Sequence, residues 1–313
     1  MKYFFLVFVF GFLSLSSCSK KTNDNPVSPP RGDTTVIPVD TSSFARGADV
    51  SWVTQMESQG IKFYNKNGAQ QDLFQILKDE GMNSIRLRVW VTPPGGWCNT
   101  ADVVAKSLRA KAAGMKILID FHYSDTWADP GDQTTPAAWQ NQTITQLDSS
   151  VNAYTTGVLD TLKLNGISPD WVQVGNETND GMLWPEGRAS VSMANFASLI
   201  NAGYDAVKSV FPSTKVIVHI SNGFDNTLFR WMFDGLQSNG AKWDVIGMSL
   251  YPTASNWTQL NAECLANMND MVSRYNKEVM VCEVGMSVSD SVACKNFISD
   301  LIQKSESVPN NKC

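Results

Sequence analysis

Two glutamates stand at or near the ends of short apolar runs that are typical of buried β-strands. Glu177 closes the expected strand 171–177 in the motif Gly175-Asn176-Glu177, and Glu283 lies near the end of 278–284. Two carboxyl groups about 5–5.5 Å apart can cleave a glycosidic bond with retention, one as acid/base and the other as nucleophile. Either glutamate alone is more simply explained as a surface or salt-bridged residue, so the chemistry rests on the pair.

Polar residues interrupt the other expected strands on one parity. In 84–90, Arg86, Arg88 and Trp90 alternate with apolar residues, although a parallel strand buried on both faces should be apolar throughout. Charge facing a barrel interior is costly unless it is paired or catalytic. The same break recurs at Asp49, Asp120, His122, Gln173, His219, Ser249 and Tyr251. Both histidines of the chain belong to this set, which favours a functional site over two satisfied core histidines.

The elements that would position these residues alternate along the chain. Strands are expected at 45–50, 84–90, 116–122, 171–177, 215–221, 244–251 and 278–284, with helices between them. Two of the helices, 71–80 and 101–113, are each followed by a glycine, the residue that commonly ends a helix. Alternating βα units predict an α/β fold with a parallel sheet, and seven of them favour a (β/α)8 TIM barrel, whose active sites lie at the carboxyl ends of the strands.

Composition limits the other possibilities. The 313 residues are 43% hydrophobic, enough for one large core, and a net charge of −5 without a basic run argues against a nucleic-acid partner. The chain has ten tryptophans, whose flat faces suit stacking on sugar rings, although core packing explains any single one more simply. Cys/His clusters typical of zinc sites are missing from the sequence, and we expect neither a metal nor a cofactor.

The N-terminus predicts export and a lipid anchor. An apolar run from Tyr3 to Leu15 is too short for a permanent membrane span, and it ends in Leu15-Ser16-Ser17-Cys18, which matches a bacterial lipobox. Residues 1–18 are therefore expected to be a lipoprotein signal peptide ending at lipidated Cys18. The alternative is a plain secretory signal with a chance cysteine.

The rest of the chain divides into a tether and one domain. Residues 19–43 are rich in Pro, Ser, Thr and Asn and predict a flexible tether, whereas 44–313 form the expected catalytic domain. Five cysteines follow Cys18, so at least one should remain free in an exported protein: Cys98, Cys264, Cys282, Cys294 and Cys313. Cys282 is expected to be a buried core thiol.

Several motifs, in order, resemble one family of clan A glycoside hydrolases. They are Gly47-Ala48-Asp49-Val50-Ser51, Arg86-Leu87-Arg88-Val89-Trp90, the long block from Asp120 to Pro130, Gly175-Asn176-Glu177-Thr178, Ser249-Leu250-Tyr251-Pro252 and Glu283-Val284-Gly285. Together they are similar to family 53, the arabinogalactan endo-β-1,4-galactanases. The block from Asp120 to Pro130 is the most specific of them, and the resemblance covers residues 44 to about 290.

The resemblance implies a role for each matching residue. Glu177 would be the acid/base and Glu283 the nucleophile, kept ionised with the help of Arg86 and a hydrogen bond from Tyr251. Asn176 would bind the sugar 2-hydroxyl. The cleavage subsite would be lined by Asp49, His122 and His219, and the weaker candidates for stacking on neighbouring sugars are Trp90, Trp127 and Trp184.

Two features depart from the family. Its members close the barrel with an eighth strand carrying a tryptophan, but the sequence ends at Cys313 after the helix expected at 291–303. We therefore expect a barrel truncated before its eighth strand, with two unpaired edges. Some bacterial members hold calcium in a long acidic loop after the nucleophile strand. Residues 285–293 are short and carry Asp290 as their one acid, so no calcium is expected there.

Three functional readings remain open at this point. The first is retaining cleavage of β-1,4-galactan, from the arabinogalactan side chains of pectin, by a monomer that meets the membrane through its lipid anchor alone. The others are a clan A hydrolase acting on another β-glycan, and a non-catalytic glycan-binding lipoprotein. The predicted location is an exported lipoprotein of the outer membrane, facing the cell surface or the periplasm.

Overall fold

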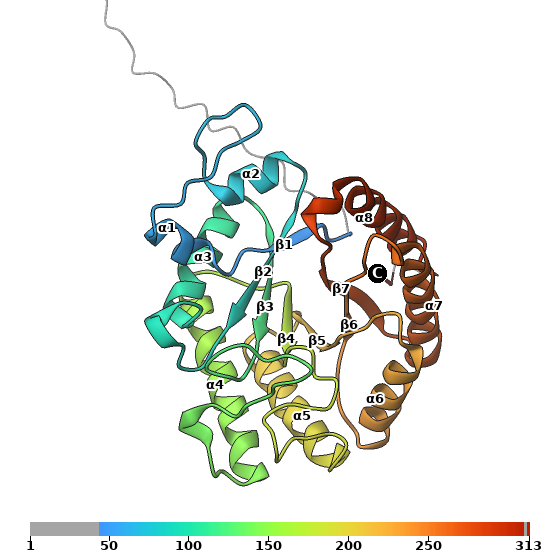
Figure 1. Ribbon diagram of the computed structural model, residues 1–313. Helices are drawn as coiled ribbons and strands as arrows, with labels where there is room; N and C mark the ends of the chain where they lie inside the picture. The colour runs from blue at the N-terminus through green and yellow to red at the C-terminus, as the bar shows by residue number, and fades with distance from the viewer. Residues whose placement is uncertain (1–43, 310–311) are drawn as a thin grey trace, which may run out of the picture. The chain divides into compact units, whose positions relative to one another are not determined.

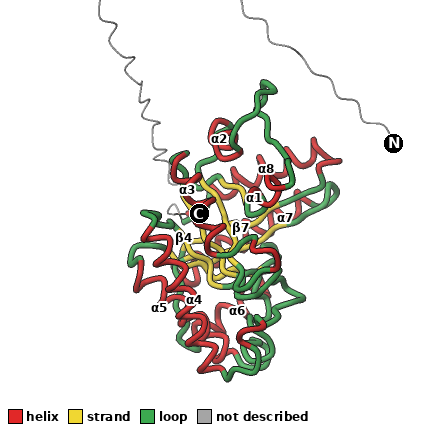
Figure 2. The backbone as a smooth tube through the Cα atoms, turned by 90° about the vertical axis from the view of Figure 1, so that its left-hand side faces the viewer, coloured by secondary structure: helices red, strands yellow, loops and turns green. Residues whose placement is uncertain are grey.

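Seven parallel strands form one sheet whose spatial order, β1 to β7, follows the chain. The computed structural model describes residues 44–309 and 312–313, so the predicted signal peptide, Cys18 and the tether lie outside the described residues. The strands curve around a common centre with the helices outside them (Figures 1 and 2). They are β1 (Gly47–Asp49), β2 (Ser84–Val89), β3 (Lys116–Phe121), β4 (Trp171–Val174), β5 (Lys215–Ile220), β6 (Val245–Leu250) and β7 (Glu278–Val284).

The helices follow the strands in the order expected of βα units. They are α1 (Val53–Ser58), α2 (Leu73–Asp79), α3 (Thr100–Ala112), α4 (Ile144–Leu164), α5 (Met193–Val210), α6 (Asn226–Ser238), α7 (Trp257–Tyr275) and α8 (Ser291–Glu306). Short polar side chains begin several of them; Asn99, for instance, accepts a hydrogen bond from the Asp102 N–H at the start of α3. The predicted α/β barrel class is confirmed. In the part of the chain that the structure describes, no helix is both long and apolar enough to cross a membrane.

The barrel is open in the described residues. β1 pairs with β2 and β7 pairs with β6, but β1 and β7 are not paired with each other, and no eighth strand is described. This agrees with the expected truncated barrel. Most residues of β7 are only partly buried, whereas the strands β2, β4 and β6 are buried throughout.

The five cysteines that lie among the described residues are all free. The expectation of a buried Cys282 was wrong in degree. Its sulfur lies inside the barrel near Gly247, but the side chain keeps partial exposure because β7 is an edge strand.

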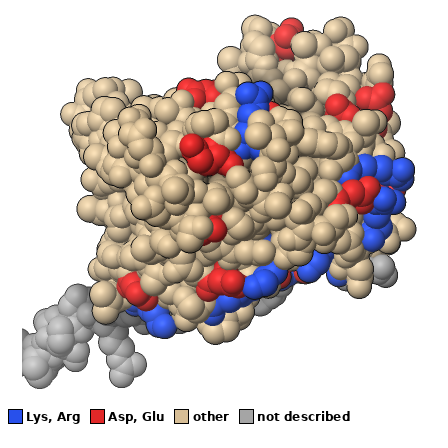
Figure 3. Space-filling model, turned by 90° about the horizontal axis from the view of Figure 1, so that it is seen from below, with Lys and Arg blue, Asp and Glu red and all other residues tan. Residues whose placement is uncertain are grey.

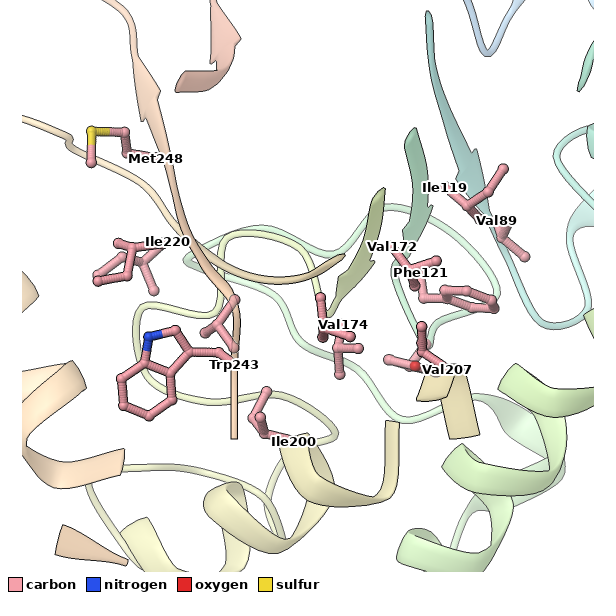
Figure 4. Packing of buried hydrophobic residues seen from close by; sticks show 14 of the residues in the cluster. Val89, Ile119, Phe121, Val172, Val174, Ile200, Val207, Ile220, Trp243 and Met248 are labelled. Atoms are coloured by element: carbon pink, nitrogen blue, oxygen red, sulfur yellow. The ribbon is translucent and has the colours of Figure 1, made fainter. Parts of the chain in front are cut away.

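The apolar parity of the strands packs outward against the helices. Figure 4 shows Phe121 and Val174 on the strand side of this core, and Ile200 and Val207 of α5 on the helix side. All four side chains are buried. The alternation read from the sequence therefore places one set of residues between sheet and helices and turns the other set into the barrel.

The barrel interior has an apolar floor and a polar upper part. Leu118, Trp171, Ile217 and Val245, from β3 to β6, form a separate buried cluster. Two residues further along each of these strands stand Asp120, Gln173, His219 and Gly247. The polar groups thus gather toward the carboxyl ends of the strands, where barrel active sites lie.

One face of the molecule shows how surface charge is distributed. In Figure 3, acidic and basic side chains are interspersed among residues that are mostly uncharged. That face carries no broad patch of one sign.

The outer core allows a direct test of packing. Phe233 on α6 is 0% exposed and its ring lies 5.5 Å from Trp243 and 5.9 Å from Tyr275, centroid to centroid. Phe233→Ala should lower the free energy of unfolding by about 3–5 kcal/mol, because it removes buried surface and leaves a cavity. Trp231→Ala is the control, since Trp231 lies on the same helix and is 43% exposed. Urea denaturation would measure both, and equal losses would contradict this assignment of the core.

Candidate active site

Arg86 on β2 organises the mouth of the barrel. Its Nη1 lies 3.1 Å from Asp49 Oδ2, and its Nη2 lies 2.8 Å from both Asp120 Oδ2 and Glu283 Oε1. The guanidinium is buried, and its contacts reach β1, β3 and β7. These carboxylates raise the pKa of Arg86 against the opposing effect of its burial, so the cation is permanent.

Glu283 is held as an anion. Burial acts to raise its pKa, but the Arg86 charge and a hydrogen bond from Tyr251 bring the pKa below its usual value. The Tyr251 hydroxyl donates to Glu283 Oε2 at 2.7 Å, while Arg86 contacts the other oxygen. The contacts with Tyr251 and Arg86 that the sequence suggested are therefore present.

A bulge turns Glu283 into the barrel. Between β6 and β7 the register passes from Met248↔Val281 to Ser249↔Glu283, which leaves Cys282 without a partner residue. Strict alternation would place the side chains of Cys282 and Glu283 on opposite faces. In the structure the Cys282 sulfur faces Gly247 inside the barrel, and Glu283 reaches Arg86 in the same interior. The bulge re-aims the carboxylate, as bulges near active sites commonly do.

Glu177 lies just past β4 on a turn, which corrects the predicted strand end. β4 ends at Val174, because Gly175 (φ 83°) and Glu177 (φ 43°) both adopt left-handed backbone conformations. A side chain at Gly175 would come within 2.6 Å of Thr178 Cγ2, so the turn needs glycine there. The Thr178 N–H donates to the His219 carbonyl, which ties the turn to β5.

Glu177 differs from Glu283 in its electrostatic surroundings. Burial, with the negative charge of Glu283, raises the pKa of Glu177 to about 7, although a hydrogen bond with Ser249 and the charge of Arg86 act in the opposite direction. Ser249 is also the register partner of Glu283. The two carboxyl groups therefore occupy the same mouth, with one favouring the protonated form and the other the ionised form.

A chain of polar side chains runs behind Glu177. His219 is fully buried and burial lowers its pKa to about 4, so the ring is neutral near pH 7. Its Nδ1 lies 2.9 Å from Gln173 Nε2, and its Nε2 lies 2.8 Å from Ser249 Oγ. Because the Gln173 amide is a donor, Nε2 should carry the ring proton and donate to Ser249, leaving the serine hydroxyl free to donate to Glu177.

Asn176 is fixed on both sides of its amide. Its Oδ1 accepts from Arg86 Nη2 at 2.8 Å, and its Nδ2 donates to the Ala128 carbonyl at 2.8 Å. The Ala128 N–H in turn donates to His122 Nδ1 at 3.1 Å, and His122 Nε2 faces Asp120 at 2.9 Å. The loop after β3 therefore joins Asn176 and His122 into the network around Arg86.

The predicted aromatic residues lie in different surroundings. Trp127, in the loop after β3, is exposed, whereas Trp90 is buried beside it, with ring centroids 5.8 Å apart. Trp184 is half-buried within the loop before α5, where its indole N–H donates to the Asp180 carbonyl and Arg188 lies over its ring. Of the three, Trp127 offers the most exposed ring.

The structure joins most of the predicted site residues and adds others. Asp49, Arg86, Asn176, Tyr251 and the glutamate pair form one connected group with the two histidines, whereas Trp184 stands apart in its loop. The sequence marked Asp120, Gln173 and Ser249 as inward-facing without giving them a role. It did not identify Trp52, whose ring centroid lies 5.9 Å from that of Trp127. Trp52 directly follows the first strand motif, and this position at the carboxyl end of a strand could have indicated a site residue. Its contacts with other site residues arise only in the fold.

The arrangement suits acid–base and nucleophilic chemistry by side chains. A carboxyl group with pKa near 7 can donate a proton at neutral pH, and an ionised carboxylate beside it can attack or stabilise a developing cation. Among residues 44–309 and 312–313, no group of three or more His, Cys, Asp or Glu side chains is placed to hold a metal ion.

Comparisons with known proteins agree with this geometry. A model of Glycosyl hydrolase family 53 matches residues 45–312. A probable arabinogalactan endo-β-1,4-galactanase A of Neosartorya fischeri is 40% identical over 263 residues, which is 82% of this chain and 73% of the relative. An arabinogalactan endo-β-1,4-galactanase of Thermothelomyces thermophilus is 37% identical over 262 residues, 82% of this chain and 78% of the relative.

Solved structures give the same result. A structure described as that of two fungal β-1,4-galactanases superposes with a TM-score of 0.79 at 34% identity, covering 85% of this chain and 86% of its own. The family 53 catalytic domain of Ignisphaera aggregans gives a TM-score of 0.78 at 33% identity, covering 89% and 84%.

The titration of Glu177 tests the electrostatics of the site. Ser249→Ala should move the pKa of Glu177 above about 7, because the hydrogen bond with Ser249 favours the ionised carboxylate. The fraction protonated at pH 7 should therefore rise. Carbon-13 NMR of labelled glutamate side chains would measure this, with Glu177→Gln to assign the signal and Ser255→Ala, at an exposed loop position, as control. An unchanged or lowered pKa in Ser249→Ala would contradict the assigned hydrogen bond.

Proposed function

The chain belongs to glycosyl hydrolase family 53 and is a glycosidase, and from that premise we propose that it is a retaining endo-hydrolase of β-1,4-galactan. The observation that carries the mechanism is the opposite bias of two neighbouring carboxyl groups: the pKa of Glu177 is raised to about 7 and that of Glu283 is lowered. The names of the relatives, arabinogalactan endo-β-1,4-galactanases, support galactan as the substrate. The proposed natural source is the arabinogalactan side chains of pectin.

In the first step, Glu283 attacks the anomeric carbon while Glu177 protonates the departing glycosidic oxygen. The C–O bond to the leaving sugar breaks as the bond to a Glu283 oxygen forms, giving a covalent glycosyl-enzyme. Arg86 and Tyr251 hold Glu283 ionised and oriented before attack. Neutralisation of Glu283 in the intermediate removes its charge from the surroundings of Glu177, which favours ionisation of Glu177.

In the second step, ionised Glu177 removes a proton from water, whose oxygen attacks the same anomeric carbon. The bond to Glu283 breaks, the sugar leaves with its original anomeric configuration, and both carboxyl groups return to their starting states. Asn176, held by Arg86 and the Ala128 carbonyl, is the proposed partner of the sugar 2-hydroxyl. Asp49, His122 and His219 would line the subsite in which cleavage occurs.

A second candidate function keeps the fold but not the chemistry, namely non-catalytic glycan binding. The exposed Trp127 would serve a binder equally well. The connected network around both glutamates favours the enzyme, because a binder has no need of carboxyl groups in opposite protonation states. A clan A hydrolase acting on another β-glycan would use the same mechanism.

We also propose that the protein is exported and anchored to the outer membrane through lipid on Cys18, and that it acts as a monomer. The support is the sequence Leu15-Ser16-Ser17-Cys18 after an apolar run. Cys18→Ala should move the protein from the membrane fraction to the soluble fraction on expression in a bacterial host, and mass spectrometry of the wild-type N-terminus should find acylated Cys18. Equal fractionation of the two proteins would refute the anchor.

Substitution of each glutamate tests the proposed chemistry. Glu177→Gln and Glu283→Gln should each lower kcat on β-1,4-galactan by about 10²–10⁴-fold or more, because the amide can neither donate the proton nor attack. Glu278→Gln is the control, since it lies at the other end of β7 and pairs with Lys215. Release of reducing sugar measures the rates, and xylan and mannan test the substrate. Galactan binding without cleavage by the wild type would favour the binding protein.

A further inference from the structure

A second arginine of β2 is enclosed by tryptophans beside the proposed active site. Arg88 is 2% exposed, and its guanidinium carbon lies 4.1 Å from the ring centroids of both Trp52 and Trp127 and 4.9 Å from that of Trp90. The rings come from three consecutive units of the barrel, in the segments after β1, β2 and β3. We call Arg88, Trp52, Trp90 and Trp127 the arginine cage.

The cage holds a buried charge with little conventional pairing. Nε and Nη2 of Arg88 have no hydrogen-bond partner among the described residues, and the ion-pair contact of Nη1 is with Asp49 Oδ1 at 4.0 Å. Asp49 also forms an ion pair with Arg86, at the shorter distance of 3.1 Å. A neutral side chain of similar volume would avoid the cost of desolvating this cation. The aromatic faces are what stabilise the guanidinium here.

The cage determines which part of Trp127 meets solvent. Residue Trp127 is 48% exposed and the Arg88 guanidinium lies over one face of its ring, which leaves the opposite face for a ligand. The Arg88 guanidinium also contacts the ring of Trp52, whose centroid lies 5.9 Å from that of Trp127. Arg88 and Trp52 thus hold the indole of Trp127 in place before any ligand binds.

The open face adjoins the catalytic network. The ring centroid of Trp127 lies 5.7 Å from that of His122, and the next residue, Ala128, holds both His122 and Asn176 through its backbone. A sugar resting on Trp127 would therefore lie next to the bond that is cleaved. In galactose the axial 4-hydroxyl leaves the hydrogens of C3, C4 and C5 on one face of the ring, which gives an apolar surface suited to an indole.

We propose that Arg88 is a positioning residue for carbohydrate binding, which fixes the Trp127 indole as a preformed platform for a galactosyl unit next to the cleaved bond. The inference rests on the proposed function for the identity of the sugar. A ring that is already fixed loses little conformational freedom when the sugar binds, so the benefit falls on affinity. Arg88 contacts neither glutamate, so the chemical step should be affected much less.

Four variants test this role in the full chain: Arg88→Met, Arg88→Lys, Trp127→Ala and the double variant Arg88→Met/Trp127→Ala. Arg88→Met should raise KM for β-1,4-galactan about 5–10-fold with kcat changed less than about twofold, and Arg88→Lys should be intermediate because it keeps the charge but loses the planar stack. The matched control is Arg109→Met, since Arg109 lies 4.6 Å over Phe74 on the helical layer outside the barrel.

The double variant separates positioning from general destabilisation. If Arg88 acts through Trp127, Arg88→Met should have no further effect on KM once Trp127 is alanine. Multiplying effects on KM, or a loss confined to kcat, would overturn the proposal. Thermal unfolding of each variant shows whether it is folded, and if Arg88→Met does not fold, Arg88→Lys takes its place in the same comparison, alone and combined with Trp127→Ala.

A spectroscopic readout needs no substrate and keeps this inference distinct from the proposed function. In the wild type, ring currents should shift the Arg88 Nε–H signal upfield, and Trp127→Ala should partly remove the shift. An Nε–H chemical shift in the ordinary range for arginine would show that the rings do not enclose Arg88. Absence of cleavage of every β-glycan tested would overturn the proposed function, and a normal ring-current shift would then leave the cage standing without its galactosyl ligand.

Discussion

The contact between Arg86 and its three carboxylates is the constraint on which the rest of the site depends. The buried Arg86 cation would be too costly alone, and so would the buried Asp120 carboxylate and the partly buried Glu283 carboxylate without it. Together they form a network in which each charge is stabilised by its neighbours, across strands that are distant in sequence. The sheet places these side chains at one mouth, and the network in turn fixes Glu283 and Asn176 with little freedom to move.

Two local distortions give the glutamates their different properties. The bulge in β7 turns Glu283 toward Arg86, which favours its ionised form. The left-handed turn after β4 carries Glu177 to a partly buried position, where it bonds to Ser249, and the loss of solvation favours its protonated form. One residue type thus serves two chemical roles because the backbone delivers each side chain to a different environment.

Much of this was predictable from the sequence, and the reasons are physical. Parity breaks in the strands marked Arg86, Asp120, His219 and Ser249 as inward-facing, because the side-chain period of a strand is two. The βα alternation predicted the barrel. The bulge and the left-handed turn could not be predicted, since both depend on tertiary pairing that breaks the same periodicity. The arginine cage was missed because Trp52 lies outside the expected strands, where no alternation of polar and apolar residues could mark it. The cage forms only in the fold, where the segments after three strands meet.

The most direct measurement is to identify the residue that becomes covalently bound to substrate. In a 2-deoxy-2-fluoro-galactobioside, the fluorine destabilises the transition states of both steps and slows them. A good leaving group restores the rate of the first step alone, so the glycosyl-enzyme accumulates. Intact mass and peptide mass spectrometry should then find one 2-deoxy-2-fluoro-galactobiosyl group, a disaccharide, on Glu283. A label on Glu177, or cleavage of galactan with no glycosyl-enzyme and inverted product configuration, would contradict the proposed roles of the two glutamates.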